Sequence, residues 1–388
     1  MPAMDATASA RRQTVKMRKL PNGEATRVDD AVPEIVWPPR VVQPARPPAL
    51  IYLDLNHYIN LARTAAGLQV PDGYDGLLRA ATAARQQDRA VFPLSGTHYM
   101  EMSGILDPAQ RTAVAEVMES LSGFRVLLGR VTLAELEIDA MIDALLSPRS
   151  AAERIDLLGP TFGWAFGMRG GLTIRDADGR DSSASMREEV GDREFERIMA
   201  GATLAFERGM LAGPPDEEIA ALRAQGYAPE KTREVTERRA QQERDLSGRL
   251  DKEDRWRRGR LRDVVSASEL THEWLDQITR ATLARGTTIG QVVREDRERM
   301  RAFAEGMPSS RVAISLKARY HRDGRHQWTT NDIHDIDALT VAVPYCDAVF
   351  TDKAARNALA ASSELRPFGT FLPRKPGELA DWLDNLTG

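Results

Sequence analysis

Residues 49–62 read ALIYLDLNHYINLA, a run of five apolar residues that ends at Asp54 and continues into a helical pattern. A short apolar run of this kind is typical of a buried strand. Similar short strands are expected at four further places: 90–95 (AVFPLS), 124–128 (FRVLL), 348–351 (AVFT) and 369–372 (GTFL). Helical patterns separate most of these segments. The alternation predicts an α/β fold, a parallel sheet flanked by helices.

The helical patterns lie between and after these strands. We expect helices at 56–66, 74–87, 97–106, 108–121, 329–346, 352–362 and 378–386. Pro108 suits the first turn of its helix, where the missing N–H costs nothing. The last segment, ELADWLDNL, is a short amphipathic helix.

Composition divides the chain into unequal parts. Residues 1–48 are expected to form a disordered, Pro-rich tail. The α/β pattern occupies 49–130 and 326–375, a large mostly helical insertion fills 131–325, and 376–388 form a C-terminal helix. Within the insertion, residues 228–262 carry twelve basic and eight acidic side chains. Such mixed charge usually marks a solvated helix, and a phosphate-contacting arm is the alternative.

Several protein classes are excluded by composition. The chain has 388 residues and a formal net charge of -4, so bulk charge does not indicate nucleic-acid binding. Its single cysteine, Cys346, excludes an intramolecular disulfide and a multi-cysteine metal site. No 18-residue apolar run predicts a membrane span, and the first twenty residues lack the apolar core of a secretory signal. We therefore expect a cytoplasmic protein with no membrane contact.

Acidic residues gather where the expected strands end. The set comprises Asp54, Glu101, Asp332, Asp335, Asp337 and Asp352. The carboxyl ends of parallel strands meet at one edge of a sheet, where ligands bind, so these acids are expected to converge. Aspartate is also a preferred helix N-cap, and that interpretation stays open for Asp54, Asp332, Asp335 and Asp352.

A cluster of carboxylates implies a cation. Four carboxylates at one edge would repel one another and raise each other's pKa unless positive charge were present. Oxygen ligands without cysteine or a dense histidine cluster suit Mg²⁺ or Mn²⁺. A pair of such ions is suited to phosphodiester hydrolysis. His57 and His98 border the expected site, but we interpret them as polar residues at helix starts, because a metal site makes a histidine base dispensable.

Four segments together resemble the PIN-domain ribonucleases, a family of metal-dependent nucleases related to many bacterial toxins. They are IYLDLNHYINLA around Asp54, LSGTHYMEMSGI around Glu101, DIDALTVAV around Asp335 and Asp337, and CDAVFTDK ending just after Asp352. Their order matches that of the family's acids. The resemblance covers about a third of the chain and implies a PIN-like sheet.

The resemblance also implies roles for individual residues. Asp54, Glu101, Asp335 and Asp352 would be catalytic acids that bind Mg²⁺ or Mn²⁺, most simply as two ions. Asp337 is the alternative third acid, and Asp332 shares a helix face with Asp335. Thr351 would orient a water or phosphate, or make a local bond to the backbone.

These features predict a metal-dependent endoribonuclease that hydrolyses phosphodiester bonds of single-stranded or structured RNA. Candidate phosphate contacts in the insertion are Arg257, Arg258, Arg260 and Arg262. Two alternatives stay open: a nuclease acting on DNA flaps, and a non-catalytic PIN-like interaction module. The insertion departs from the small family domain, so a lid, an RNA-binding arm or a surface for a homo-oligomer are all open roles. A protein inhibitor or antitoxin is also open as a partner.

Overall fold

The apolar run at residues 49–53 forms the central strand of a small parallel sheet. The computed structural model describes residues 33–146, 153–214, 216–224, 228–293 and 297–387. In it, β2 (Ala49–Leu53) lies between β3 (Ala90–Val91) and β7 (Ala348–Phe350), parallel to both. Every residue of β2 is buried, as in a strand that is covered on both faces.

Single bridges extend the sheet on both sides. Leu94 pairs with Val126 of β4 (Val126–Leu127), and Ala348 pairs with Phe371, both in parallel. The spatial order is therefore β4, the β3 segment, β2, β7 and Phe371. The chain starts at the centre, steps outward through β3 and β4, and later returns to the other side of β2. This makes the gap between the carboxyl ends of β2 and β7 a topological switch point, the usual ligand position in such sheets.

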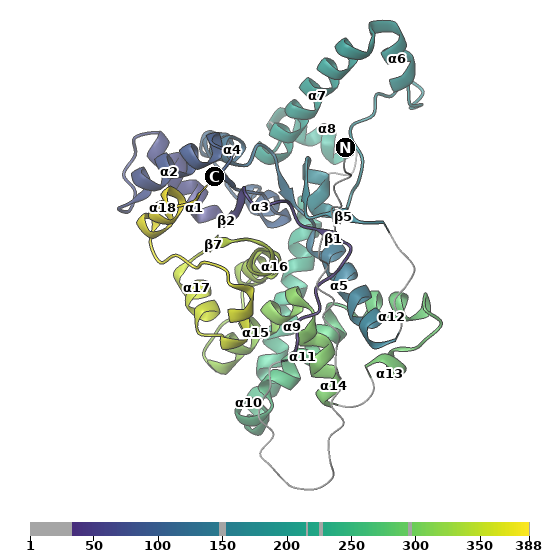
Figure 1. Ribbon diagram of the computed structural model, residues 1–388, viewed down its shortest axis with the longest axis vertical. Coiled ribbons are helices and arrows are strands. Elements are labelled where there is room, and N and C mark those ends of the chain that lie inside the picture. Colours follow the sequence, from purple (N-terminus) through teal and green to yellow (C-terminus); the bar gives the residue numbers. More distant parts are fainter. Residues whose placement is uncertain (1–32, 147–152, 215, 225–227, 294–296, 388) are drawn as a thin grey trace, which may run out of the picture. The chain divides into compact units, whose positions relative to one another are not determined.

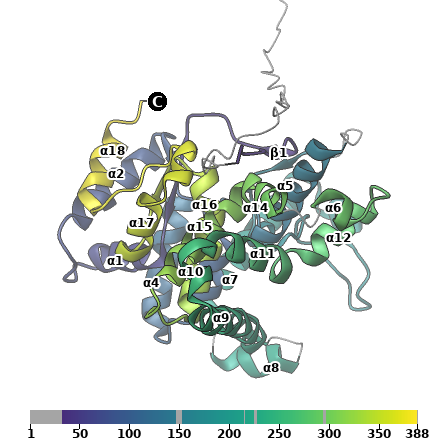
Figure 2. The same cartoon turned by 90° about the horizontal axis from the view of Figure 1, so that it is seen from below.

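Helices cover both faces of the sheet, as predicted. Alternate β2 residues separate into two cores: Ile51 and Leu53 pack in one, Leu50 and Tyr52 in the other. The first core is closed by α1 (Leu55–Ala65), α2 (Tyr74–Gln86), α4 (Pro108–Ser122) and α18 (Pro376–Asp384). The second is closed by α5 (Arg130–Leu145), α15 (Pro308–Arg322), α16 (Thr330–Tyr345) and α17 (Lys353–Ala360). Helices α2 and α18 lie side by side in both views (Figures 1 and 2).

The segment predicted as an insertion is mostly helical. Its helices are α6 (Ser183–Val190), α7 (Asp192–Ala212), α8 (Ile219–Ala224), α9 (Pro229–Lys252), α10 (Asp254–Gly259), α11 (Leu261–His272), α12 (Leu275–Leu283), α13 (Ile289–Val292) and α14 (Arg297–Gly306). It also contains the 3-10 helices η1 (Phe162–Phe166) and η2 (Asp216–Glu218). A further 3-10 helix, η3 (Ser363–Phe368), and the short α3 (Gly96–Met102) belong to the α/β part.

The insertion is not a separate domain. Residues 33–388 form one compact unit, in which α15 packs against α16 and α11 against α15. The stripe Thr236, Ala240, Glu243 and Leu250 of α9 is buried, so this charged helix is not the solvated arm that its composition suggests. Figure 2 shows α9 end-on, next to α8 and below α11. A packed α9 lets the insertion contribute directly to the surroundings of the sheet edge.

The predicted N-terminal tail is too long. Residues 33–48 lie against the rest of the unit, whereas the prediction for 1–32 falls outside the described residues. Strand β1 (Val41–Val42) pairs with β5 (Ile155–Asp156), and Arg40 forms an ion pair with Asp139. Strand β6 (Leu158–Gly159) pairs with β4 in the antiparallel sense. The proline content signalled an extended conformation and gave no information about these contacts.

Across the described residues, no helix combines the length and the apolar composition needed to cross a bilayer.

Candidate metal centre

Three aspartates meet at the switch point of the sheet. Asp54 follows β2, Asp352 comes two residues after β7, and Asp335 lies in the second turn of α16. Each offers one carboxylate oxygen, and these oxygens all lie within 4.8 Å of one another. The side chains come from segments almost three hundred residues apart in sequence, and parallel strand ends bring them together as predicted.

Capping and ligation are compatible for two of these aspartates. Asp54 is the N-cap of α1, and its Oδ1 accepts a hydrogen bond of 2.8 Å from the backbone N–H of Leu55. Asp352 is the N-cap of α17, and its Oδ1 accepts from the N–H groups of Ala354 and Ala355. In both residues Oδ2 has no hydrogen-bond or ion-pair partner among the described residues. One oxygen therefore fixes each carboxylate, and the other can bind a cation.

The electrostatics of the cluster are unfavourable without positive charge. Burial, with a contribution from Asp352, raises the pKa of Asp54 to about 6. Burial and the charges of Asp54, Asp352 and Asp332 raise the pKa of Asp335 to about 8. No hydrogen bond or ion pair engages the Asp335 carboxylate within the described part of the chain. These carboxylates would gain from a divalent cation that neutralises their mutual repulsion.

Glu101 is the fourth acid of the site. It lies on α3 and is half-buried, and α3 packs against α16. Its pKa is raised to about 8 by burial and by the charges of Asp54 and Asp335, so the aspartates act on it electrostatically. Glu101 is not part of the three-residue group that shares the 4.8 Å limit. We call Asp54, Glu101, Asp335 and Asp352 the acid site.

The structure corrects the alternative choice of Asp337. Its carboxylate accepts hydrogen bonds of 2.6 and 2.8 Å from Arg239 and lies 3.2 Å from the Arg130 guanidinium. These arginines outweigh burial and lower the pKa of Asp337. Positions 335 and 337 are two residues apart on one helix, so their side chains point in widely different directions. Asp337 belongs to an ion-paired network and not to the acid site.

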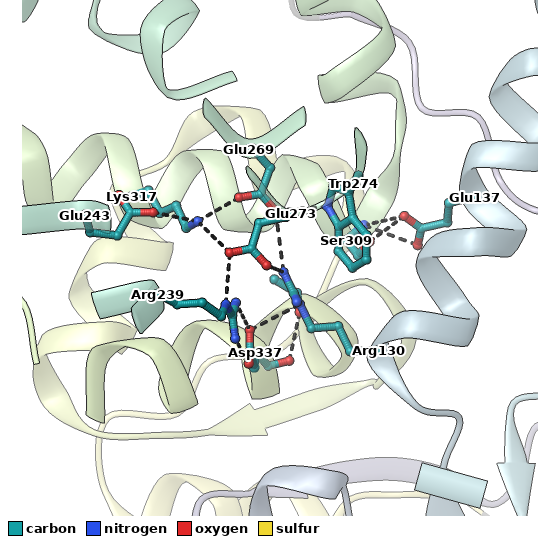
Figure 3. A network of polar contacts seen from close by, with 11 residues as sticks. Arg130, Glu137, Arg239, Glu243, Glu269, Glu273, Trp274, Ser309, Lys317 and Asp337 are labelled. Atoms are coloured by element: carbon teal, nitrogen blue, oxygen red, sulfur yellow. Dashed lines mark hydrogen bonds and ion pairs between the residues drawn. The ribbon is translucent and has the colours of Figure 1, made fainter. Parts of the chain in front are cut away.

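That network joins the insertion to α16 (Figure 3). Arg239 also binds Glu273 at 2.9 Å, and Lys317 lies 2.8 Å from both Glu243 and Glu269. The ion-paired network comprises Arg130, Arg239, Glu243, Glu269, Glu273, Lys317 and Asp337. Sequence inspection missed it, because its charges come from five helices with no local motif.

Asp332 has a capping role. Its carboxylate accepts from the Thr329 N–H at 2.7 Å and from the Thr329 hydroxyl at 2.8 Å, which forms the capping box of α16. The carboxylate also lies 3.4 Å from His326. This pairing holds Asp332 at the start of the helix, while its charge still reaches Asp335.

Most of the arginines predicted to contact phosphate form ion pairs within the protein. Arg262 binds Glu305 and Glu364, Arg257 lies 2.7 Å from Asp251, and Arg258 is paired with Asp254. Arg257 and Arg262 are largely buried in these ion pairs, so they are not free phosphate contacts. Arg258 and Arg260 are exposed, and their contact with phosphate stays a prediction.

Two histidines pack around the end of β2, close to Asp54. His98 lies 2.8 Å from the Leu53 carbonyl through Nε2, and the His57 ring stacks on Phe350 with centroids 3.5 Å apart. Burial lowers the pKa of both histidines to about 4. Thr351 is buried between Phe350 and Asp352, and its proposed contact with water or phosphate stays a prediction.

A large cleft beside the acid site was not foreseen. Glu101 and His334 line it together with aromatic residues of η1 and α7 and the N-terminal half of α9. Tyr320 also lies near the aspartates, since burial and the charges of Asp335, Asp352 and Asp332 raise its pKa. The residues that form this cleft are distant in sequence, and their aromatic side chains resemble ordinary core positions.

The donor set fits Mg²⁺ or Mn²⁺. Asp54, Asp335 and Asp352 supply hard oxygen donors, and the group contains no histidine or cysteine. The charges of Asp54 and Asp335 also raise the pKa of Glu101. The free oxygens of Asp54 and Asp352 are held in place by their capping bonds. Comparison with protein-family models, with curated proteins and with solved structures found no match to this chain.

Proposed function

We propose that this protein is a metal-dependent endoribonuclease with a PIN-like α/β core. One observation carries the proposal: Asp54, Asp335 and Asp352 offer oxygens within 4.8 Å of one another at the switch point of a parallel sheet. Other buried carboxylates have partners: Asp337 and Glu269 pair with arginine or lysine, and Glu137 accepts hydrogen bonds from Ser309 and Tyr345. The acid site has no arginine or lysine partner among the described residues.

The acidic residues have distinct roles in this proposal. Asp54, Asp335 and Asp352 hold one Mg²⁺ or Mn²⁺ ion, and Glu101 helps to hold a second. Such ions, when bound, supply Lewis-acid chemistry that favours water attack on a phosphodiester and departure of the leaving oxygen. The capping bonds of Asp54 and Asp352 fix their carboxylates before the ion arrives, and this lowers the cost of organising the site.

The PIN-like assignment is supported by order and topology. The chain supplies a strand-end aspartate, a helical glutamate, an aspartate near a helix start and a second strand-end aspartate, in that order. The first strand is central, and the strand that precedes the last aspartate lies beside it. RNA is the substrate that the family resemblance favours.

Cleavage of a labelled single-stranded RNA in Mn²⁺, Mg²⁺ or EDTA tests this function. We expect wild-type cleavage in either metal and none in EDTA, with loss in Asp352→Asn. A matched control is Asp347→Asn at the opposite end of β7, where Asp347 accepts from the Leu50 N–H and pairs with Arg46. It should remain active at a temperature where it is folded.

Two results would overturn the proposal. One is cleavage that persists in a double Asp54→Asn, Asp352→Asn variant, which would identify a contaminating nuclease or another site. The other is a wild-type protein that cleaves no RNA in either metal. Running a DNA strand of the same sequence in parallel separates an RNA-specific enzyme from a DNA nuclease.

A further inference from the structure

A cleft of about 1800 Å³ opens beside the acid site. Its walls come from α3, η1, α7, α9 and the first turns of α16. Small-molecule sites usually occupy about 300–1,000 Å³, so this cleft has room for more than one nucleotide.

One wall is aromatic and partly open to solvent. Phe166 is 45% exposed and Phe206 is 39% exposed. The ring of Phe162 lies between them, with centroid distances of 5.9 Å to Phe166 and 5.3 Å to Phe206. Tyr99 supports Phe162 at 6.0 Å. Contiguous groups of exposed apolar side chains are uncommon on monomeric proteins, and where they occur they often form binding sites.

The wall formed by α9 is polar and of mixed charge, because Glu234, Glu237 and Asp245 line it together with two arginines. Arg233 and Arg238 of α9 are exposed, and no ion pair engages either one among the residues that the structure describes. Asn331 lies at the start of α16 and offers an amide. The Nδ1 atom of His334, next in sequence to Asp335, is buried without a hydrogen-bond partner in this same region.

The cleft is continuous with the acid site. Glu101 belongs to both, and His334 and Asp335 are neighbours on α16. A chain that lies along the cleft would therefore lead to the three aspartates. Aromatic rings stack on the face of any base, arginines contact phosphates, and amides bond to base edges.

We propose that this cleft binds unpaired bases of single-stranded RNA, which stack on Phe166 and Phe206 while the adjacent phosphate lies at the acid site. The placement of that phosphate rests on the proposed nuclease function. A duplex keeps its bases stacked on one another and cannot present them to this wall. The insertion thus selects single strands, because η1, α7 and α9 build the cleft.

Binding of RNA to the full-length chain tests this inference without cleavage. An Asp54→Asn background in Mg²⁺ would be titrated against a labelled 12-nucleotide RNA, and fluorescence anisotropy would report the Kd. Two further probes are an abasic strand of the same length and an RNA duplex. Phe166→Ala and Phe206→Ala remove the stacking rings, and Phe206→Trp restores one. Leu283→Ala on α12, which is 66% exposed, is the matched control for loss of a surface apolar side chain.

We expect each alanine variant to bind the RNA about 5- to 150-fold more weakly, the range that a lost base–aromatic stack produces. Phe206→Trp and Leu283→Ala should bind like the background protein. The abasic strand and the duplex should bind weakly to every variant. Equal binding of the RNA and the abasic strand, alanine variants that match Leu283→Ala, or no RNA binding at all would overturn the inference.

Separate readouts distinguish this inference from the nuclease proposal. Wild-type protein that fails to cleave RNA in Mn²⁺, while RNA binding still depends on Phe166 and Phe206, would overturn the nuclease and leave the base-binding cleft. Metal-dependent RNA cleavage, together with an RNA affinity that does not change in Phe166→Ala or Phe206→Ala, would overturn only the proposal that the cleft binds bases. If a DNA strand of the same sequence binds as tightly as the RNA, the proposal that the cleft is specific for RNA is wrong.

Discussion

Helix α16 carries two half-buried aspartates with opposite surroundings. Asp337 lies between Arg130 and Arg239, and its pKa is lowered. Asp335, two residues earlier, faces Asp54 and Asp352, and its pKa is raised to about 8. Two arginines therefore neutralise Asp337, whereas no cationic side chain pairs with Asp335 among the described residues. This difference in charge distinguishes the ion-paired network around Asp337 from the acid site, where a bound cation would reduce the repulsion between carboxylates.

The strongest consequence concerns stability. Asp337→Asn should lower the free energy of unfolding by about 3–5 kcal/mol, because it leaves Arg130 and Arg239 short of a partner in a buried network. Asp335→Asn on the same helix is the matched control and should be neutral or stabilising in EDTA, since it removes a repulsive charge. Urea unfolding of both variants measures the difference. Equal destabilisation by the two substitutions would remove the distinction between the two sites.

Metal addition should act on only one of the two sites. An ion that binds the folded state at 100 times its Kd adds about 2.7 kcal/mol to the free energy of unfolding. We expect Mn²⁺ to raise the melting temperature of the wild type, and to raise that of Asp335→Asn much less or not at all. Ca²⁺-free buffer and a preceding EDTA wash provide the baseline. A shift of the same size in Asp335→Asn would place the metal elsewhere.

The pH dependence of stability should also reveal the acid site. Asp335 and Glu101 have pKa values raised to about 8 from ordinary values of 3.8 and 4.5, so the folded state holds more protons than the unfolded state between these limits. The free energy of unfolding must then fall as pH rises through this window, and the stabilisation is complete only at low pH. In EDTA we expect the melting temperature of the wild type to fall from pH 6.5 to 8.5.

Comparison with a variant isolates this effect. Asp335→Asn should show a smaller decline over the same pH range, because one raised pKa is gone and Glu101 loses a repulsive neighbour. His57 and His98 have pKa values lowered to about 4, so their stabilisation is lost only as pH falls below about 6.5 and does not enter this window. Parallel pH profiles for the two proteins would contradict the assignment.

The smallest predicted effect concerns the helix that positions Asp335. Thr329→Ala removes the hydroxyl of the α16 capping box and should cost about 1 kcal/mol. Because Asp335 lies on the second turn of α16, Mn²⁺ affinity should weaken slightly and RNA cleavage should persist. Thermal melts and metal titration measure the two effects. Abolished metal binding would mean that Thr329 or Asp332 belongs to the site itself.

The sequence was sufficient to locate the strands of the main sheet and its acids, but not the short strands β1, β5 and β6. A short apolar run that ends in aspartate identifies the end of a buried strand, and parallel topology then brings Asp54 and Asp352 together. Local pattern could not decide between Asp335 and Asp337, because that choice depends on which face of α16 meets the sheet edge. Asp337 is excluded from the acid site by its ion pair with Arg239, which lies almost a hundred residues away in sequence on α9.

The insertion was the least predictable part. Its charged composition suggested a solvated arm, but Glu243 and Lys317 are buried as partners of one another, and pairing of this kind leaves no local signature. The phosphate contacts were placed on Arg257, Arg258, Arg260 and Arg262, whereas the arginines that line the cleft are Arg233 and Arg238 in the first half of α9. Long-range packing determines which basic residues are free.

Calorimetric titration of Mn²⁺ into metal-free protein tests the central claim most directly. The account predicts saturable binding to the wild type and to the conservative control Asp347→Asn. It predicts binding that is lost or at least about tenfold weaker in Asp335→Asn, which lacks one carboxylate of the group. Absence of binding to the wild type, or equal affinity in wild type and Asp335→Asn, would contradict the claim that these acids form a metal site.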